Sequence, residues 1–316
     1  MPTVPSAIAI AISDLHLSLL QPACRADKDW MAVQAGYLDQ VKKIERELAP
    51  IAGLQNSGVP ILCAGDIFDR WNAPPELINF ALKHLPDGMI CVPGQHDLPN
   101  HRTDQVHRSG YGVLKEVGKI VDISGKTYRP PHTPGDTSWQ LQGFEWGREI
   151  KYVEAPCLSI ALIHRYCWTV EHGYPGAPES SHLGEFMKPL KGYDVAVFGD
   201  NHKGFLKALK SGTTVLNVGG FIRRKSDEIG YNPSVGIIYS DGTVKRKLLD
   251  TSADKFHEEV KERDEVPLNM KEFIDGLEGL GEHGLNFREA VENHLRDEEL
   301  TPAVKQIIKQ CLEQPK

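Results

Sequence analysis

The sequence lacks long apolar segments and paired cysteines. Its longest early apolar run, 7–12, is far shorter than the roughly 18 residues of a membrane-spanning helix, and no basic residues precede it as they would in a signal peptide. The six cysteines include no Cys-x-x-Cys pair, so neither a zinc knuckle nor a disulfide framework is expected. We expect a soluble cytoplasmic protein with buried free thiols and no membrane contact.

Positive charge is also scarce. The chain has 36 lysines and arginines against 43 aspartates and glutamates, which gives a formal net charge of -7. This balance argues against binding nucleic acid through a bulk positive potential. A local basic groove is still compatible with it, and bound cations would offset part of the negative charge. The length of 316 residues, 40% of them hydrophobic, is enough for one main domain and an appendage.

Short apolar runs alternate with helical patterns over the first two thirds of the chain, which predicts an α/β domain. Almost every residue of the runs is apolar, as in strands that are buried on both faces. The predicted strands are 7–12, 59–64, 89–92, 158–163 and 194–198, and the predicted helices are 29–54 and 75–85. Later alternating stretches at 213–218, 235–239 and 243–249 indicate antiparallel strands.

The composition changes again near residue 250. We expect the main domain to cover 1–250, a charged stretch that forms a solvated linker or a surface segment to cover 251–268, and a helical segment to cover 269–316. The last segment contains three short amphipathic patterns. Its helices would either cap the main domain or dock a partner protein.

Polar side chains follow five of the predicted strands. In an open α/β sheet, ligands bind at the carboxyl ends of the strands, so these endings would meet around one crevice. The five endings are Ser13-Asp14-Leu15-His16, Gly65-Asp66-Ile67-Phe68-Asp69-Arg70, Gly94-Gln95-His96-Asp97, His164-Arg165 and Gly199-Asp200-Asn201-His202. Each ending alone has an ordinary explanation, such as a structural histidine or a capped turn. Those explanations do not account for carboxylate, imidazole or amide groups after all five strands.

These endings, in this order, resemble the five motifs of the calcineurin-like metallophosphoesterases. The family motifs read Asp-x-His, Gly-Asp-x-x-Asp, Gly-Asn-His-Asp, a lone His, and Gly-His-x-His. The resemblance covers roughly residues 7–250 and implies a four-layer α/β/β/α sandwich, with 1–250 as the catalytic domain and a helical appendage outside it. The sequence of 13–17 and 65–69 is most similar to the DNA-nuclease branch of SbcD type.

The resemblance implies a pair of divalent metal ions bridged by Asp66. One ion would also take Asp14, His16 and His202, and the other would take Gln95, His164 and Asp200. His96 would be the catalytic acid, with Asp97 holding its other ring nitrogen. Asp69 would support the ligands, and Arg70 would contact the phosphate.

Two positions depart from the family pattern, and both would bind the second ion. Gln95 stands where Asn is usual, and Asp200 stands where the first His of Gly-His-x-His is usual. Both keep a metal donor, so catalysis should be retained. The anionic oxygen of Asp200 makes the site harder, which favours Mn or Mg over Zn; Mn is expected, with Mg, Fe or Zn as alternatives.

The resemblance therefore implies a metal-dependent phosphoesterase, and the favoured interpretation is a DNA exonuclease. Such an enzyme could work with an SbcC-like ATPase docked through 269–316, and the chain could also form a homodimer. Residues that could contact DNA are Arg70, Arg102, Arg108, Arg165, Lys203, Lys207, the run Arg223-Arg224-Lys225, Trp71, Tyr166 and Trp168, with 171–179 as a loop beside them. The alternatives are a small-molecule or nucleotide phosphodiesterase or phosphatase, and a non-catalytic scaffold.

Overall fold

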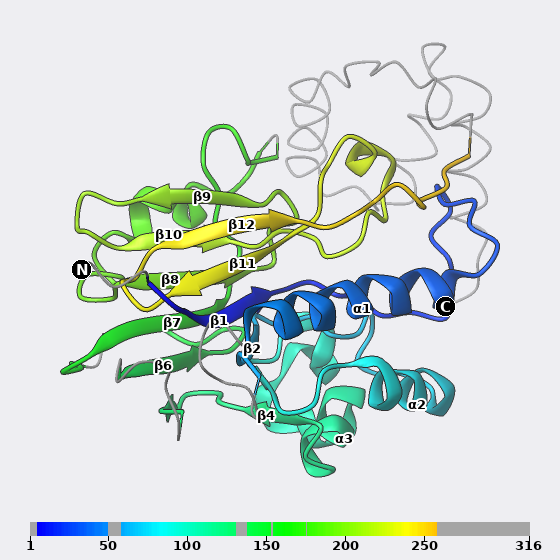
Figure 1. Cartoon of the computed structure of the whole chain (residues 1–316), viewed down its shortest axis with the longest axis horizontal. Helices are drawn as coiled ribbons and strands as arrows, with labels where there is room; N and C mark the ends of the chain where they lie inside the picture. The colour runs from blue at the N-terminus through cyan, green and yellow to red at the C-terminus, as the bar shows by residue number, and fades with distance from the viewer. Residues whose placement is uncertain (1–4, 50–57, 131–137, 153, 175, 258–316) are drawn as a thin grey trace, which may run out of the picture. The chain divides into compact units, whose positions relative to one another are not determined.

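A computed structural model of the chain describes residues 5–49, 58–130, 138–152, 154–174 and 176–257. Its first sheet has the strand order β12-β11-β1-β2-β3-β4 (Figure 1). The strands are β1 (Ala7–Ile12), β2 (Ile61–Cys63), β3 (Met89–Cys91), β4 (Ile120–Asp122), β11 (Ser234–Tyr239) and β12 (Val244–Leu248). The strands β1 to β4 run parallel, and β11 joins the far side of β1 in the antiparallel direction.

The second sheet has the order β5-β6-β7-β8-β10-β9. Its strands are β5 (Thr127–Tyr128), β6 (Trp139–Phe144), β7 (Leu158–His164), β8 (Val195–Gly199), β9 (Phe205–Ala208) and β10 (Thr214–Asn217). The four central strands are parallel, and the two edge strands are antiparallel to their neighbours. The whole sheet lies within 127–217, between the last parallel strand of the first sheet and β11.

The two sheets pack face to face around an apolar core. Ile8, Leu62, Leu162, Val197 and Leu216 belong to one buried cluster that draws on both sheets. Alternate residues of β1 enter a different cluster, on the helical side of the first sheet. Strands buried on both faces must be apolar throughout, which explains the runs in the sequence.

Three helices cover the outer face of the first sheet (Figure 1). They are α1 (Trp30–Leu48), α2 (Pro75–His84) and α3 (Gly110–Glu116). The first begins at Asp29, whose side chain accepts a hydrogen bond from the amide of Ala32. None of the helices in the described part of the chain is long and apolar enough to cross a bilayer.

The outer face of the second sheet is covered differently. Leu183, Phe186 and Leu190 pack there against Phe198 of β8, and the first two lie in a short 3-10 turn, Leu183–Phe186. The predicted fold class, an α/β protein with two stacked sheets, is confirmed. Within the described residues the fourth layer consists of 3-10 turns and loops, where the prediction placed α-helix. The predicted helices of 269–316 lie outside those residues.

In the described part of the predicted linker, 251–257, four of the seven residues are exposed, whereas Asp254 packs onto the domain. The carboxylate of Asp254 is 2% exposed and pairs with Arg25 at 2.9 Å and with Arg223 at 2.8 Å. It also accepts a hydrogen bond from the hydroxyl of Tyr37 at 2.8 Å. The carboxylate of Asp254 is thus the centre of a buried ion network. A count of charged residues cannot distinguish a residue in such a network from one in a solvated segment. The rest of the predicted linker lies outside the described residues.

Candidate metal centre

The loops that follow β1 and β2 are joined by backbone hydrogen bonds. The amide of Asp14 donates to the carbonyl of Gly65 at 3.0 Å, and the amide of His16 donates to the carbonyl of Asp66 at 2.9 Å. Gly65 and Gly94 are required here because a Cβ at either position would collide with the ring of His164. The local backbone therefore brings the carboxyl ends of both sheets into contact.

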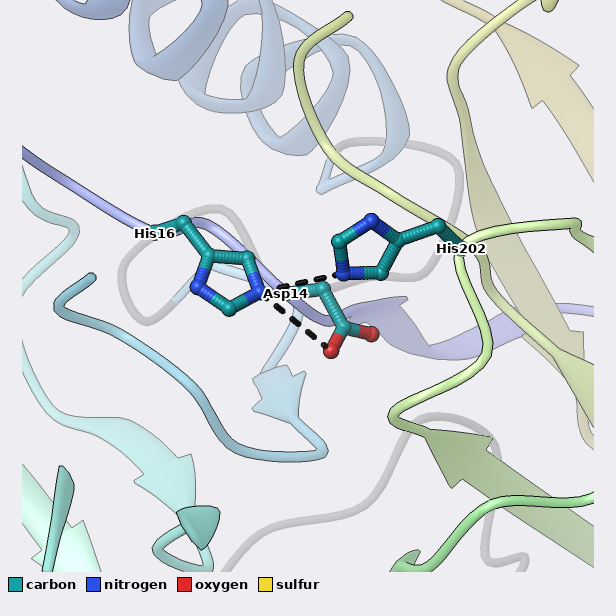
Figure 2. Close-up of side chains that lie close together, drawn as sticks. All are labelled: Asp14, His16 and His202. Carbon is teal, nitrogen blue, oxygen red and sulfur yellow. Dashed lines mark hydrogen bonds and ion pairs between the residues drawn. The ribbon is translucent and has the colours of Figure 1, made fainter. Parts of the chain in front are cut away.

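Asp14, His16 and His202 form a cluster of potential metal ligands (Figure 2). The Nε2 atom of His16 lies 3.1 Å from the Nε2 atom of His202 and 3.9 Å from Oδ1 of Asp14. The side chains of Asp14 and His16 are 0% and 5% exposed. Carboxylate oxygens and imidazole nitrogens that converge in this way suit a transition-metal ion.

Asp66 lies between the two groups of predicted ligands. Its Oδ1 accepts a hydrogen bond from the amide of His96 at 2.9 Å. Its Oδ2 is buried and has no hydrogen-bond partner within the described chain, and it lies 3.7 Å from His16 Nε2 and 3.5 Å from His164 Nε2. An unpaired buried carboxylate oxygen is costly. A cation on either side would give Oδ2 of Asp66 a partner. The position of Asp66 therefore fits a ligand that bridges two ions.

Gln95, His164 and Asp200 contact one another beside Asp66. The Oε1 atom of Gln95 lies 2.6 Å from Nε2 of His164, and the Nε2 atom of Gln95 donates to Oδ1 of Asp200 at 2.9 Å. The Nδ1 atom of His164 faces the carbonyl of Ala64, so Nε2, which contacts Gln95, is the ring nitrogen placed to bind a metal. All seven predicted ligands are therefore gathered around one centre, and they supply the mixed oxygen and nitrogen donors that a pair of divalent ions requires.

Four of these ligands have an unfavourable backbone conformation. Their φ angles are 52° for Asp14, 44° for His16, 55° for Asp66 and 83° for Asp200. A non-glycine residue in the left-handed region costs on the order of 1–3 kcal/mol, and such strain concentrates at functional sites. In the described part of the chain, only Asn100 and His101 share this feature among the other non-glycine residues.

Burial shifts the pKa values of the ligands away from their ordinary range. Burial, together with the charges of Asp97 and Asp14, raises the pKa of Asp66 well above its usual value. Burial also raises the pKa of Asp14, and it lowers the pKa of His16 well below the usual range. Crowded carboxylates without a counter-charge resist ionisation, and a divalent cation would supply that charge.

Glu228 supports the centre and was missed by the sequence analysis. Its Oε1 lies 3.2 Å from Nδ1 of His202, and its Oε2 accepts hydrogen bonds from the amides of Arg224 and Lys225. Burial acts to lower the pKa of His202, but Glu228 and the charge of Asp14 outweigh it and raise that pKa. A carboxylate on the far nitrogen of a metal-binding histidine fixes the tautomer and the ring orientation.

His96 lies beside the centre, but its partner differs from the predicted one. Its Nδ1 lies 2.6 Å from the backbone carbonyl of Asp69, and its ring meets the ring of His16 edge-on at 4.7 Å. Asp97 is buried and accepts hydrogen bonds from the amides of Ile67, Phe68 and Gly94. The prediction that Asp97 holds the His96 ring is therefore wrong, and its role is to fix the loops after β2 and β3.

Arg70, the predicted phosphate contact, lies away from the cavity over the centre, and Arg224 lines it. The side chain of Arg70 is exposed. Arg224 donates to the carbonyl of His16 at 2.6 Å and pairs with the carboxylate of Asp69 at 2.8 Å. Arg224 thus joins Asp69 to the backbone of His16. The Oδ1 atom of Asp69 also lies 3.8 Å from Nδ1 of His16.

The cavity has a volume of about 810 Å³ and contains the predicted ligands Asp66 and His202 in its wall. Lys203 and Lys225 add positive charge to it, and Tyr166 adds an aromatic ring. Of the other aromatic residues that the sequence suggested, Trp71 and Trp168 do not line it. Trp168 instead donates its indole N–H to the carbonyl of Pro178 at 2.8 Å.

The fold and the site together define a two-sheet α/β protein with a metal-binding centre at the carboxyl ends of its strands. The family model "Calcineurin-like phosphoesterase" matches residues 9–204. The chain belongs to this family, whose members are metal-dependent hydrolases. No curated protein matches the chain in sequence.

Several solved structures resemble the fold at low sequence identity. A 5'-nucleotidase precursor from Thermus thermophilus is 13% identical over 82% of this chain and 57% of its own, with a TM-score of 0.43. A sulfate thiohydrolase from the same organism, SoxB, is 10% identical over 83% of this chain and 60% of its own, also with a TM-score of 0.43. An archaeal phosphodiesterase is 15% identical over 76% of this chain and 99% of its own, with a TM-score of 0.34. This chain thus spans little more than half of two of these proteins, and its family assignment rests on the sequence match.

Proposed function

We propose that this protein is a divalent-metal-dependent phosphodiesterase that degrades DNA, as an exonuclease of SbcD type. The observation that carries the proposal is the unpaired Oδ2 atom of Asp66, which lies near His16 of the first sheet and His164 of the second at the wall of an open cavity. Arg224, Lys203 and Lys225 line that cavity. They provide the local positive charge that a phosphodiester needs, despite the net charge of -7.

The family pattern implies two groups of ligands, one for each ion. Asp14, His16 and His202 would hold one ion, Gln95, His164 and Asp200 would hold the other, and Asp66 would contact both. When bound, the ions supply Lewis acidity toward the phosphate and lower the pKa of water. The oxygen-rich second group favours Mn, with Mg, Fe or Zn as alternatives.

His96 is suited to protonate the leaving oxygen. A carbonyl only accepts hydrogen bonds, so Nδ1 of His96 must donate to the carbonyl of Asp69. A second proton on the ring would therefore be on Nε2. The ring is exposed and lines the cavity. It can therefore hold a proton at Nε2 and deliver it to a leaving alkoxide.

A small-molecule or nucleotide phosphodiesterase is the second candidate. The cavity volume of about 810 Å³ lies within the range of pockets that enclose a small ligand, and the net negative charge would not favour a long polyanion. A non-catalytic scaffold is less well supported, because a purely structural fold would not need strained ligands and an unpaired buried carboxylate. An SbcC-like ATPase bound through 269–316, a homodimer and a cytoplasmic location remain parts of the proposal.

The test is a direct comparison of substrates. The full chain, loaded with Mn, is assayed for release of nucleotides from labelled duplex and single-stranded DNA, and for hydrolysis of bis-p-nitrophenyl phosphate. The proposal expects Mn-dependent activity on DNA that disappears in Asp66→Asn. Turnover of the small ester with intact DNA would overturn the nuclease assignment in favour of the second candidate. Inactivity on both substrates in protein that binds metal would favour the scaffold.

A further inference from the structure

A half-buried tyrosine and an exposed one form an aromatic pair in the cavity of the metal centre. The rings of Tyr166 and Tyr174 lie 5.2 Å apart between centroids at an angle of 52°, and both residues line the cavity. Tyr174 is 50% exposed. Tyr166 comes two residues after the ligand His164 at the end of β7. An aromatic surface therefore lies within the same cavity as the metal ligands and is accessible from it.

The loop that carries Tyr174 is tied to the metal-binding motif after β8. Asn201 is 3% exposed, and its side-chain amide donates to the carbonyls of Cys167 and His172 at 2.8 and 2.9 Å. The ammonium of Lys203 donates to the carbonyl of Gly173 at 3.1 Å. Asn201 lies between the ligands Asp200 and His202, so these bonds fix the tyrosine pair relative to the centre.

The position of Tyr174 is not explained by packing of its own loop. Trp168 forms the internal contacts of that loop, because its ring meets the ring of His182 at 4.7 Å and its indole N–H binds Pro178. Tyr174 adds no buried side chain to these contacts of Trp168. A tyrosine that is half exposed beside a cavity is instead a surface on which a planar ring can stack.

We propose that Tyr166 and Tyr174 form a nucleobase subsite, on which the base next to the scissile phosphate stacks. This inference rests on the proposed phosphodiesterase activity and specifies its substrate class as nucleotidyl esters. Arg224 and Lys225 line the same cavity, so a phosphate and an attached base could each be bound there. Stacking of this kind tolerates any base, because every base has a π face.

The test compares a thymidine dinucleotide with the same diester in which an abasic residue replaces one nucleoside, in turn on each side of the phosphate. We expect the full Mn-loaded chain to prefer the complete dinucleotide by about tenfold in kcat/KM, within the range that stacking of one base provides. Tyr174→Ala should remove this preference, so that kcat/KM for the complete dinucleotide falls to about the value for the abasic diester. Tyr174→Phe, which keeps the ring, should retain it.

Tyr152→Ala is the matched control, since Tyr152 is 38% exposed and does not line the cavity. Binding of thymidine monophosphate and of deoxyribose 5-phosphate to the metal-free chain is measured by calorimetry as a second readout. Base-selective binding that depends on Tyr174, without hydrolysis of any diester, would support the subsite and overturn the proposed activity. Hydrolysis without preference for the base, or an equal loss on both substrates in Tyr174→Ala, would overturn the subsite.

Discussion

At the scale of single residues, the two departures from the family pattern contact each other. Gln95 donates through its amide nitrogen to the carboxylate of Asp200 at 2.9 Å. The carboxylate of Asp200 accepts this bond. A histidine at position 200 that bound a metal through one ring nitrogen would offer the amide of Gln95 only its other ring nitrogen. The extra methylene of glutamine extends the amide toward Asp200. The substitutions are therefore best understood as one coupled change that keeps donors on the second ion.

Replacement of His96 tests its role as an acid. We expect His96→Ala to retain both ions, because its nearest described contacts are the carbonyl of Asp69 and the ring of His16. Turnover should fall by about 10² to 10⁴, the range for loss of a general acid. Elemental analysis and steady-state kinetics measure the two quantities, with His107→Ala, an exposed histidine, as the control. Loss of metal from His96→Ala would identify the residue as a ligand.

Replacement of Glu228 tests the support of His202. Glu228→Gln keeps the shape of the side chain but removes the negative charge that holds Nδ1 of His202. We expect the affinity for Mn to fall by about 10- to 100-fold, as is typical when a partner of a metal-binding histidine is changed. Titration with Mn measures this, and Glu116→Gln, an exposed change on α3, is the control. Equal affinities in the two variants would contradict the role of Glu228.

The convergence of the candidate ligands could be predicted from the sequence, but one of their neighbours could not. Each candidate ligand lies at the end of a strand or in the loop after it, in a short motif, so local sequence was sufficient. Glu228 reaches the centre only because the chain folds back, and nothing in its own segment indicates it, whereas the sequence suggested Arg224 only as a possible DNA contact. Asp97 was misassigned because it follows His96 in a 3-10 turn, Gln95–Asp97, where adjacent side chains point in different directions.

At the scale of elements, the prediction worked best for strands that are wholly apolar. All six residues of β1 are buried, and its bounds were predicted correctly. β6 was missed because its sequence contains two glutamines, although Gln140 is 1% exposed in the structure. Polar residues in a buried strand remove the apolar signal on which sequence reasoning depends.

The segment after β12 offers a test of element packing. Asp254→Ala removes the carboxylate that joins Arg25, Arg223 and Tyr37, and it leaves buried positive charge with fewer partners. We expect the free energy of unfolding to fall by about 3–5 kcal/mol, the cost of breaking a buried ion pair. Urea denaturation measures this. Ser252→Ala, a change at an exposed neighbour, should alter the free energy of unfolding by less than about 0.5 kcal/mol. An equally small effect of Asp254→Ala would show that the segment is not bound as described.

At the scale of the whole molecule, the ligands come from both sheets. Asp14, His16 and Asp66 follow strands of the first sheet, and His164 and His202 belong to or follow strands of the second. Ions bound at this centre would therefore link the sheets as well as support catalysis. The unfolded chain does not hold the ligands together, so metal binding should stabilise the folded state.

Metal addition after chelation should raise the melting temperature. At a free Mn concentration of about 100 times Kd, the free energy of unfolding should increase by about 2.7 kcal/mol for each ion bound. For a protein of this size this corresponds to a rise of several degrees, at roughly 2–4 °C per kcal/mol. Thermal unfolding followed by circular dichroism measures the rise, and Asp66→Asn should abolish it. The same rise in Asp66→Asn would place the stabilising ion elsewhere.

The order of the strands also determines when the domain can be completed during synthesis. In the first sheet β1 lies between β2 and β11, and the amide of Ser6 bonds to Ser240, 234 residues away. Until β11 leaves the ribosome, one side of β1 is an open strand edge made entirely of apolar residues, which is a site for wrong pairing. The nascent chain must therefore protect this edge while the entire second sheet is being made, and a chaperone that binds 7–12 would act in that interval.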